Sequence, residues 1–461
     1  MELTMELPLN TPQYFFDDAL IADHRRLTRR WLPATIFPQP VIVPDRPWEG
    51  RMVVLYGTVV PVPDGGWRMY YTNFTPGATC PVMLATSTDG IRWEKPELGI
   101  VEWRGSTANN IVISEAWFSG EPSVIYEPED AAYPYKAVLF QTPDSTTHWA
   151  GNWGLYGYRS ADGLRWERMP AMLIQAGDRT NMMAGKVDGQ YVTYTRHKDM
   201  FTHTGTRAVY RTESADFQHW SDLELVLRPD LEDEPEIEYY GMSVFKRHGW
   251  FFGLLEYWDC ARDVIQTCLM VSRDGKQWRH TSRQPFIAAA YDWNQAWSTC
   301  ASNGPILIGD SMLFYFGGRW QAHGYDTAQQ YGAIGYASLP TDRFCALEAG
   351  AGGRLDTVPL QWPGGDLLLN ADTRDSFASH PWYLHGEIAV EILGADGEPL
   401  PDWSGDRKAV WRGNTHCRGA VHHLPVIWPG ERGLDALRGQ TIQLRFHLTH
   451  ARLFTFEAHT S

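Results

Sequence analysis

Residues 85–96 read ATSTDGIRWEKP: a strand-like run, an Asp-Gly turn and then an aromatic residue. Asp-Gly supplies the positive φ angles that a tight β-hairpin needs, and the Asp side chain caps its own turn. Residues 158–170 (YRSADGLRWERMP) and 270–280 (MVSRDGKQWRH) repeat this pattern. Degenerate copies stand at residues 212–220 (TESADFQHW) and 337–344 (ASLPTDRF). The chain therefore uses one hairpin device five times.

The spacing of these copies indicates a repeat architecture. Their Asp residues are separated by 73, 54, 58 and 68 residues, which is the kind of interval that propellers show. The intervals contain strand-like runs separated by turn residues, such as residues 53–73 and 239–257, and no long helical periodicity. About four short strands per interval make one blade. The pattern predicts a five-bladed β-propeller, and the alternative is a β-sandwich array whose hairpins merely look alike.

The composition and the strand pattern of the sequence change after Phe344. The Gly-rich segment 348–360 (EAGAGGRLDTVPL) precedes a second region of alternating strands that has the size of a β-sandwich. We therefore expect an all-β protein with a five-bladed β-propeller over residues 1–350 and a C-terminal β-sandwich domain over residues 351–461. Residues 13–21 (QYFFDDALI) are expected to add a strand to the last blade and close the ring.

The composition excludes several classes of function. Hydrophobic residues make up 43% of the 461 residues and charged residues 21%, as in globular proteins. The formal net charge of −15 argues against nucleic acid as a partner, because its phosphates require a basic surface. No apolar run reaches membrane-spanning length, and the N-terminal stretch lacks the features of a signal peptide. We expect no membrane association and a cytoplasmic location.

Metal and cofactor motifs are absent from the sequence. The six cysteines lie far apart without a C-x-x-C pair, so we expect free thiols rather than disulfides or a zinc site. The acidic run at residues 230–238 (DLEDEPEIE) suggests calcium but lacks the glycine and the spacing of an EF-hand. We predict no metal and no cofactor.

Several segments carry a resemblance to a known family. They are PDRPWEGRMVVLYGTVV (44–60), STDGIRWEKPELGIVEWRGSTANNIV (87–112), YVTYTRH (191–197) and the closing GGDLLLNAD, IAVEILGADGEPL, GQTIQLRFHL and ARLFTFEA runs (364–458). Together they resemble bacterial glycoside hydrolase family 32-like proteins, which are related to invertases, levanases and arabinanases. The resemblance implies a five-bladed propeller with a C-terminal sandwich and a glycosidase activity. The WMNDPNG-like, RDP and EC motifs of characterised invertase-type enzymes are missing, which puts fructan specificity in doubt.

Acidic residues stand ahead of each predicted inner strand, where a propeller's strands converge on a central funnel. They are Glu49, Glu121, Asp178, Glu238 and Asp292, with spacings of 72, 57, 60 and 54 residues. Acids on a solvated rim would give the same pattern. Glycoside cleavage needs two carboxyl groups, one protonated and one ionised, and crowded carboxylates acquire different pKa values.

Three of these acids are predicted to be catalytic and to converge in the funnel. The resemblance makes Glu49, next to Trp48, the first-blade nucleophile or base. Glu238, between the acidic run and the rings of Tyr239 and Tyr240, is the predicted general acid. Asp178 is the predicted third carboxylate, which orients the sugar and tunes Glu238.

The remaining site candidates are predicted to bind substrate. Trp, Tyr and Phe number 21, 21 and 19, and such rings either stack on sugar faces or fill the core. The predicted substrate-binding residues are Trp48, Glu121, Arg196, Tyr239, Tyr240, Asp292, Trp297 and His323. For Arg196 a structural role is equally open, and for His323 a core histidine is the alternative.

The leading interpretation is a hydrolase that acts on a non-reducing-end sugar, with furanosides among the candidates. A second enzyme class is an inverting phosphorylase, for which Arg196, His197 and Arg319 are the candidate phosphate ligands. A third possibility is a carbohydrate-binding propeller without catalysis, because fold does not dictate function. The sequence leaves open the sugar, the linkage, the stereochemistry and the oligomeric state.

Overall fold

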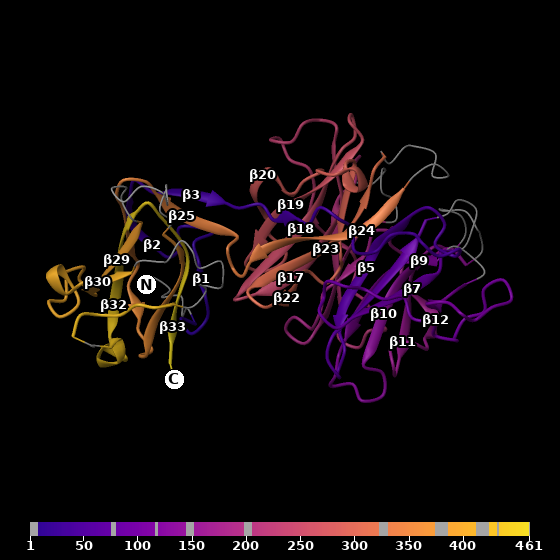
Figure 1. The fold of residues 1–461 in the computed structure, drawn as a ribbon, viewed down its shortest axis with the longest axis horizontal. Coiled ribbons are helices and arrows are strands. Elements are labelled where there is room, and N and C mark those ends of the chain that lie inside the picture. Colours follow the sequence, from indigo (N-terminus) through magenta and orange to yellow (C-terminus); the bar gives the residue numbers. More distant parts are fainter. Residues whose placement is uncertain are drawn as a thin grey trace. The chain divides into compact units, whose positions relative to one another are not determined.

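The computed structural model describes residues 8–74, 80–115, 119–143, 152–197, 205–321, 331–373, 386–411, 424–430 and 433–460. Regular structure in these residues consists of β-strands and three short 3-10 turns (Figure 1). The prediction of an all-β protein is confirmed. No helix among the described residues has the length and apolar character needed to cross a membrane.

The chain divides into two compact units. The first, called the propeller unit, comprises Ala34–Ile308 and Met312–Ser338, and the second, called the C-terminal unit, comprises Met1–Pro33, Gly309–Ser311 and Leu339–Ser461. The expected cut at residues 350 and 351 therefore differs from this division at both ends. The N-terminal segment belongs with the C-terminal unit, and the change from one unit to the other comes at Leu339.

Three sheets of the propeller unit are four-stranded antiparallel meanders. They are β5(Val53–Pro61), β6(Trp67–Asn73), β7(Val82–Ser87) and β8(Ile111–Ile113); β9(Ser119–Tyr126), β10(Tyr135–Gln141), β11(Gly154–Ser160) and β12(Glu167–Ile174); and β13(Asn181–Met182), β14(Tyr191–Thr195), β15(Val209–Ser214) and β16(Glu224–Leu227). Each meander runs outward in chain order from its first strand, which is how a propeller blade is built.

A fourth meander continues into further strands. It consists of β17(Ile237–Arg247), β18(Trp250–Asp259), β19(Val264–Ser272) and β20(Arg279–Ile287), and the further strands are β21(Trp297–Cys300), β22(Ile306–Ile308), β23(Ser311–Arg319), β24(Gly332–Pro340) and β4(Thr35–Ile36). A single parallel pair, Ile265 with Trp297, joins the two sets into one nine-stranded sheet.

Inner strands of successive sets lie against one another in a ring. Strand β5 contacts β9, β9 contacts β13, β13 contacts β17, β18 contacts β21, and β21 returns to β5. Hydrogen bonds cross these junctions, for example from the Met182 amide to Ser123 Oγ (2.7 Å) and between the hydroxyls of Thr58 and Ser302 (2.6 Å). This is the arrangement of a β-propeller. The count of five blades stays a prediction.

The repeated Asp turns adopt one geometry. Asp89 Oδ1 accepts hydrogen bonds of 2.8 Å from the amides two and three residues later, and Asp162, Asp216 and Asp274 do the same. The turn caps itself, as predicted from the sequence. The fifth copy differs, because Asp342 has a φ of 61° and accepts a hydrogen bond from the Tyr14 hydroxyl.

Tyrosines of neighbouring sheets donate hydrogen bonds to three of these turns, at Gly90, Gly163 and Gly275. The hydroxyl of Tyr70 donates to the Gly163 carbonyl (2.8 Å), and that of Tyr194 donates to the Gly275 carbonyl (2.7 Å). Each ring also meets the turn's Trp edge to face, as Tyr70 meets Trp166 at 5.8 Å and 84°. The repeated device therefore fastens one sheet to the next.

The N-terminal segment does not close the ring, contrary to the sequence prediction. Strand β1(Gln13–Tyr14) pairs with β33(Ala451–His459) of the C-terminal unit. The reason is burial: Phe15 is fully buried in that unit's core, against Phe456. Strand β4 instead pairs with the outer strand β24, Ala337 opposite Ile36.

The described residues of the C-terminal unit form two six-stranded sheets. One combines β1, β3(Thr28–Trp31), β25(Cys345–Ala349), β28(Asp366–Asp372), β31(Leu424–Pro425) and β33; the other combines β2(Ile21–Arg25), β26(Gly353–Thr357), β27(Leu360–Gln361), β29(Glu387–Gly394), β30(Ala409–Trp411) and β32(Thr441–Thr449). One apolar cluster draws side chains from both sheets, including Phe446 and Phe456. The description of this unit as a β-sandwich stays a prediction.

Candidate active site

Three inner strands of the propeller unit bulge. In β5, Leu55, Tyr56 and Gly57 together oppose one residue of β6, because Val54 pairs with Thr72 and Thr58 with Tyr70. In β9, Glu121 and Pro122 oppose Leu139 alone, and in β17 the residue Tyr240 is extra. Bulges re-aim side chains and are frequent beside active sites.

The bulge at Glu121 carries backbone strain. Its φ is 59°, in the left-handed region that a non-glycine residue seldom occupies. Residues held in sparsely populated conformations cost about 1–3 kcal/mol each and concentrate at functional sites. The strained backbone therefore makes Glu121 a candidate functional residue.

Side chains from all five sets of strands gather around these bulges. The charged cluster, as we call it, consists of Tyr56, Glu121, Asp178, Arg179, Arg196, Tyr240, Glu256, Trp297 and Arg319. All of these residues are buried except Asp178, whose side chain is 15% exposed. Such a concentration of charge below the surface is expensive unless the charges pair.

Arg179 and Glu256 form a fully buried ion pair at the base of the cluster. Arg179 Nη2 lies 2.5 Å from Glu256 Oε1 and 3.0 Å from the Cys300 carbonyl oxygen, and Nε adds bonds of 2.9 Å. Gly241 makes room for this pair. A Cβ there would meet Arg179 Cγ at 2.3 Å and Glu256 Oε2 at 2.8 Å.

A second ion pair holds Asp178. Arg196 Nη2 lies 2.5 Å from Asp178 Oδ1, and the Arg196 side chain is 2% exposed. The guanidinium also lies over the ring of Tyr240, 4.4 Å from its centre. Gly177 lets this Arg approach, because a Cβ at that glycine would stand 2.7 Å from Arg196 Cβ. The ion pair thereby fixes the position of the Asp178 carboxylate.

Glu121 stands in the opposite environment. It is 4% exposed, and its Oε2 is buried without a hydrogen-bond partner. Burial, and secondarily the negative charge of Asp178, raises the pKa of Glu121 well above its usual range, against the pull of Arg179 and Arg196. Glu121 therefore favours its protonated form, whereas Asp178 lies against the Arg196 guanidinium. Two carboxyl groups with such divergent environments can serve as acid and base.

Aromatic rings complete the cluster. Arg319 lies over the Trp297 ring at 3.9 Å and donates to the Tyr56 hydroxyl at 3.0 Å. The rings of Tyr240 and Trp297 meet edge to face at 5.1 Å. Burial is the largest influence on the hydroxyls of Tyr56 and Tyr240, and it raises the pKa of each. Both hydroxyls are therefore neutral hydrogen-bonding groups.

Glu49, the predicted nucleophile or base, contacts residues outside the charged cluster. It is fully buried, with its carboxylate 2.7 Å from Lys95 Nζ and 2.7 Å from the Tyr71 hydroxyl. The amides of Asp45 and Arg46 donate to it as well, at 2.9 Å. None of its partners belongs to the charged cluster. Local groups thus satisfy this carboxylate, and the convergence of Glu49 with Asp178 stays a prediction.

Glu238, the predicted general acid, lies beside an arginine. Its carboxylate, 19% exposed, forms an ion pair with Arg207, and Arg207 lies 5.8 Å from the centre of the Tyr240 ring. Glu238 is therefore linked to the edge of the charged cluster through one arginine. Tyr239, on the opposite face of the strand, bonds Asp233 and does not reach the cluster.

The remaining predicted binding residues divide into two groups. Glu121, which the sequence predicted to bind substrate rather than to be catalytic, lies in the charged cluster with Arg196, Tyr240 and Trp297. Trp48 donates its indole N–H to Asn110 (2.7 Å) near Glu49. His323 lies outside the described residues.

Asp292 lies in a separate cleft of about 540 Å³. The cleft is lined by Pro38, Gln39, Pro40, Ala290, Tyr291, Asp292, Trp293, Trp320 and Tyr331, and by no member of the charged cluster. Asp292 is exposed at the start of a 3-10 turn. The role of Asp292 in substrate binding stays a prediction.

Sequence reasoning missed Tyr56, Arg179 and Glu256. Glu256 carried a usable signal, because it is a carboxylate in the middle of the apolar strand β18, WFFGLLEYWD, whose other acid, Asp259, ends the strand. A buried acid in such a strand requires a basic partner. The partner, Arg179, directly follows the predicted Asp178.

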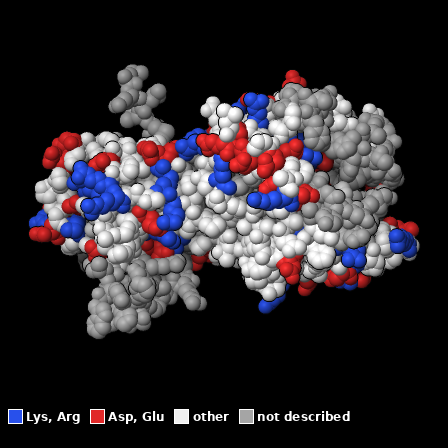
Figure 2. Space-filling view, turned by 90° about the horizontal axis from the view of Figure 1, so that it is seen from above, with Lys and Arg blue, Asp and Glu red and all other residues white. Residues whose placement is uncertain are grey.

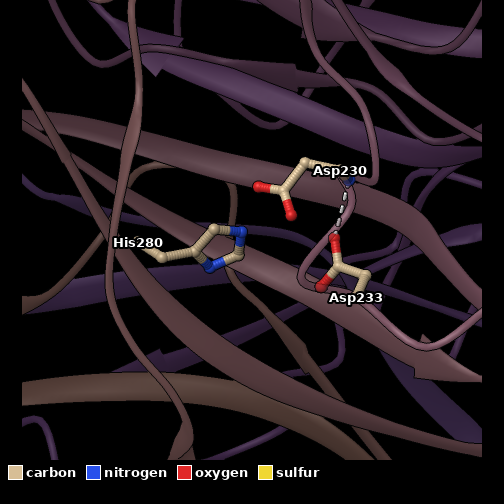
Figure 3. Close-up of side chains that lie close together, drawn as sticks. All are labelled: Asp230, Asp233 and His280. Carbon is tan, nitrogen blue, oxygen red and sulfur yellow. Dashed lines mark hydrogen bonds between the residues drawn. The ribbon is translucent and has the colours of Figure 1, made fainter.

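Asp230, Asp233 and His280 form a compact group whose ligand atoms lie within 4.8 Å of one another (Figure 3). Arg283 occupies this group: its Nη2 lies 2.7 Å from Asp230 Oδ1, and it also pairs with Asp233. The Tyr239 hydroxyl bonds both Asp233 (2.6 Å) and His280 Nε2 (2.8 Å). This arrangement is a closed ion-pair network rather than an open set of metal ligands.

The surface visible in Figure 2 carries basic side chains interspersed with acidic ones. The five described cysteines form no disulfide, in line with the expectation of free thiols. Cys417 lies outside the described residues.

No protein-family model matches the chain, and no curated protein matches its sequence. Solved structures of similar fold include an N-acetylgalactosamine deacetylase from F. plautii in complex with blood group B trisaccharide, at 14% identity over 69% of this chain and 96% of the other, with a TM-score of 0.48. A structure from the GH130 family of mannoside phosphorylases, which contains glycoside hydrolases, is 14% identical over 68% and 95% (TM-score 0.46). An α-L-arabinofuranosidase from Podospora anserina is 11% identical over 67% and 99% (TM-score 0.45).

Proposed function

We propose that this protein is a glycosidase that cleaves a non-reducing-end sugar, with furanosides among the candidate substrates, and that Glu121 and Asp178 form its carboxyl pair. The observation that carries the proposal is the contrast between these two residues. Glu121 is buried, strained and favours its protonated form, whereas Asp178 is partly exposed and paired with Arg196. Glycoside cleavage requires such a pair, one group as acid and the other as base or nucleophile.

The proposed roles follow from the surroundings of the two carboxyl groups. Glu121 donates its proton to the glycosidic oxygen as the bond to the anomeric carbon breaks, so the departing alcohol leaves neutral. Asp178 acts on the other side of the anomeric carbon, either by attacking it or by taking a proton from the attacking water. The separation of the two carboxyl groups decides between retention and inversion.

The surrounding residues supply binding and electrostatic control. The rings of Tyr240 and Trp297 offer apolar surface to a sugar face, as aromatic side chains in carbohydrate sites do. Arg196 positions Asp178 and keeps its charge in place. Arg179 and Glu256, both fully buried, hold the base of the site. Preorganised charges of this kind act most strongly where water is excluded.

The test is a screen of the purified protein against aryl glycosides and oligosaccharides, followed by the variants Glu121→Gln and Asp178→Asn. We expect sugar release by the wild-type protein, and on oligosaccharides, whose leaving groups are poor, a loss of turnover by orders of magnitude in both variants. Circular dichroism at the assay temperature checks that each variant is folded, because Asp178→Asn also removes the partner of the buried Arg196. Glu97→Gln, at an exposed position, is the control. Sugar binding without release by the wild-type protein would instead support a binding propeller and contradict the proposal.

A further inference from the structure

Arg319 differs from the other two arginines of the charged cluster. Its guanidinium is 5% exposed and forms no ion pair with a described carboxylate. Its Nη2 donates to the Tyr56 hydroxyl and its face covers Trp297, but Nε is buried without a hydrogen-bond partner. A buried charge without a counter-ion destabilises the folded protein. A buried arginine at this position is therefore explained if it binds an anionic ligand.

Arg179 contributes a second unsatisfied donor. Its Nη1 is buried without a hydrogen-bond partner, although its Nε and Nη2 are fully used by Glu256 and the Cys300 carbonyl. The guanidinium groups of Arg179 and Arg319 lie over the same ring, 5.0 Å and 5.8 Å from the centre of Tyr56. Two guanidinium groups from different strand sets, each with an N–H unused, therefore border one side chain.

The charge balance of the cluster agrees with this geometry. Arg179 and Arg196 are matched by Glu256 and Asp178. Burial holds Glu121 toward its neutral form, so it does not balance Arg319. The site therefore has an excess of positive charge before any ligand binds.

Resting on the proposed glycosidase site, we propose that its substrate or co-substrate carries an oxyanion, and that Arg319 binds that group beside Tyr56. The planar guanidinium fork matches the paired oxygens of a carboxylate or a phosphate. Two sources supply this chemistry. The oxyanion is either the carboxylate of an acidic sugar or inorganic phosphate that takes the place of water as the attacking group.

Calorimetric binding to the wild-type protein distinguishes these sources. The first probes are matched pairs of methyl glycosides, in which each neutral sugar is compared with the corresponding uronic acid. The second probe is sodium phosphate. If the sugar itself is acidic, a uronic acid binds at least tenfold more tightly than its neutral partner. If phosphate is the co-substrate, phosphate binds alone. Failure of both uronic acids and phosphate to bind at millimolar concentration overturns the inference, whatever the neutral sugars do.

Variants assign the binding to Arg319. Arg319→Gln is expected to weaken the anion at least tenfold, while Arg92→Gln removes an equal charge from an exposed side chain and leaves binding unchanged. Arg319→Lys, which keeps the charge and removes the fork, serves if the first variant does not fold, and is also expected to weaken binding about tenfold. Wild-type affinity in a folded Arg319 variant overturns the assignment.

The outcome for this inference is separable from the outcome for the glycosidase proposal. Hydrolysis of neutral glycosides by a protein that binds neither anion overturns the inference and leaves the glycosidase proposal intact. Arg319-dependent binding of an anion without cleavage of any glycoside supports the oxyanion site and contradicts the glycosidase.

Discussion

The Tyr315 hydroxyl donates a hydrogen bond to the backbone carbonyl of Gly90, although the two residues lie 225 positions apart. Tyr315 belongs to β23, in the last set of strands, and Gly90 to the turn after β7, in the first. The Tyr315 ring also meets Trp93 of that turn edge to face, at 5.5 Å and 87°. The repeated turn thus fastens the end of the propeller unit to its beginning.

Tyr315→Phe is expected to reduce the free energy of unfolding by about 1–3 kcal/mol, because it leaves a buried carbonyl without its donor. Tyr291→Phe, at a ring that is 38% exposed, is the matched control and should change stability by less than about 0.5 kcal/mol. Urea denaturation of the two variants provides the comparison. Equal stabilities would show that the Tyr315 bond does not fasten the sheets.

Glu49→Gln is expected to destabilise the protein by several kcal/mol. The substitution removes a carboxylate that is fully buried against Lys95, itself 7% exposed, and breaking such a pair costs about 3–5 kcal/mol. Glu97→Gln, at an exposed position in the same segment, is the control. A Glu49→Gln protein with wild-type melting temperature and no turnover would restore Glu49 to the catalytic set.

The stability of the wild-type protein is expected to depend on pH through Glu121. Its pKa is raised in the folded state, so the folded protein binds the proton more tightly than the unfolded chain. Stability is then greatest below the unfolded pKa of about 4.5 and falls as the pH rises toward the folded pKa. Glu121→Gln should remove this part of the pH dependence. The measurement is the melting temperature of both proteins as a function of pH, between about pH 5 and about pH 8. The same pH dependence in both proteins would contradict the raised pKa of Glu121.

Gly241→Ala is expected to disturb the base of the site. The new Cβ would stand 2.3 Å from Arg179 Cγ, so the Arg179–Glu256 pair has to move. We expect a loss of stability of about 1–3 kcal/mol and a loss of turnover. Gly350→Ala, where a Cβ meets nothing within 4 Å, is the control. A Gly241→Ala protein with wild-type stability and activity would show that the pair tolerates displacement.

The repeated features of the fold could be predicted from the sequence because they depend on local chemistry. Asp89 and its counterparts cap their own turns through contacts two and three residues away, so the pattern is visible in any single copy. The N-terminal strand was misplaced because pairing with β33 depends on where Phe15 is buried. This strand pairing joins segments that lie about 440 residues apart in the sequence. The residues near β1 in the sequence therefore do not reveal it.

The site was only partly predictable for a similar reason. Placement before an inner strand brought Glu121, Asp178 and Glu238 into consideration, but it could not rank them. Their ranking depends on partners such as Arg196 and Arg207, and on the bulge that gives Glu121 its φ of 59°. Glu49 fits the same pattern in the sequence, yet Lys95, 46 residues later, makes it structural.

The most direct test of the central claim compares leaving groups in the Glu121→Gln variant. If Glu121 is the general acid, the variant should lose about 10²–10⁴ in kcat on a glycoside with a poor, alkyl leaving group. It should lose far less on an aryl glycoside whose phenol is acidic enough to depart without a proton. An equal loss on both substrates, or full activity on both, would contradict the role of Glu121 as the proton donor.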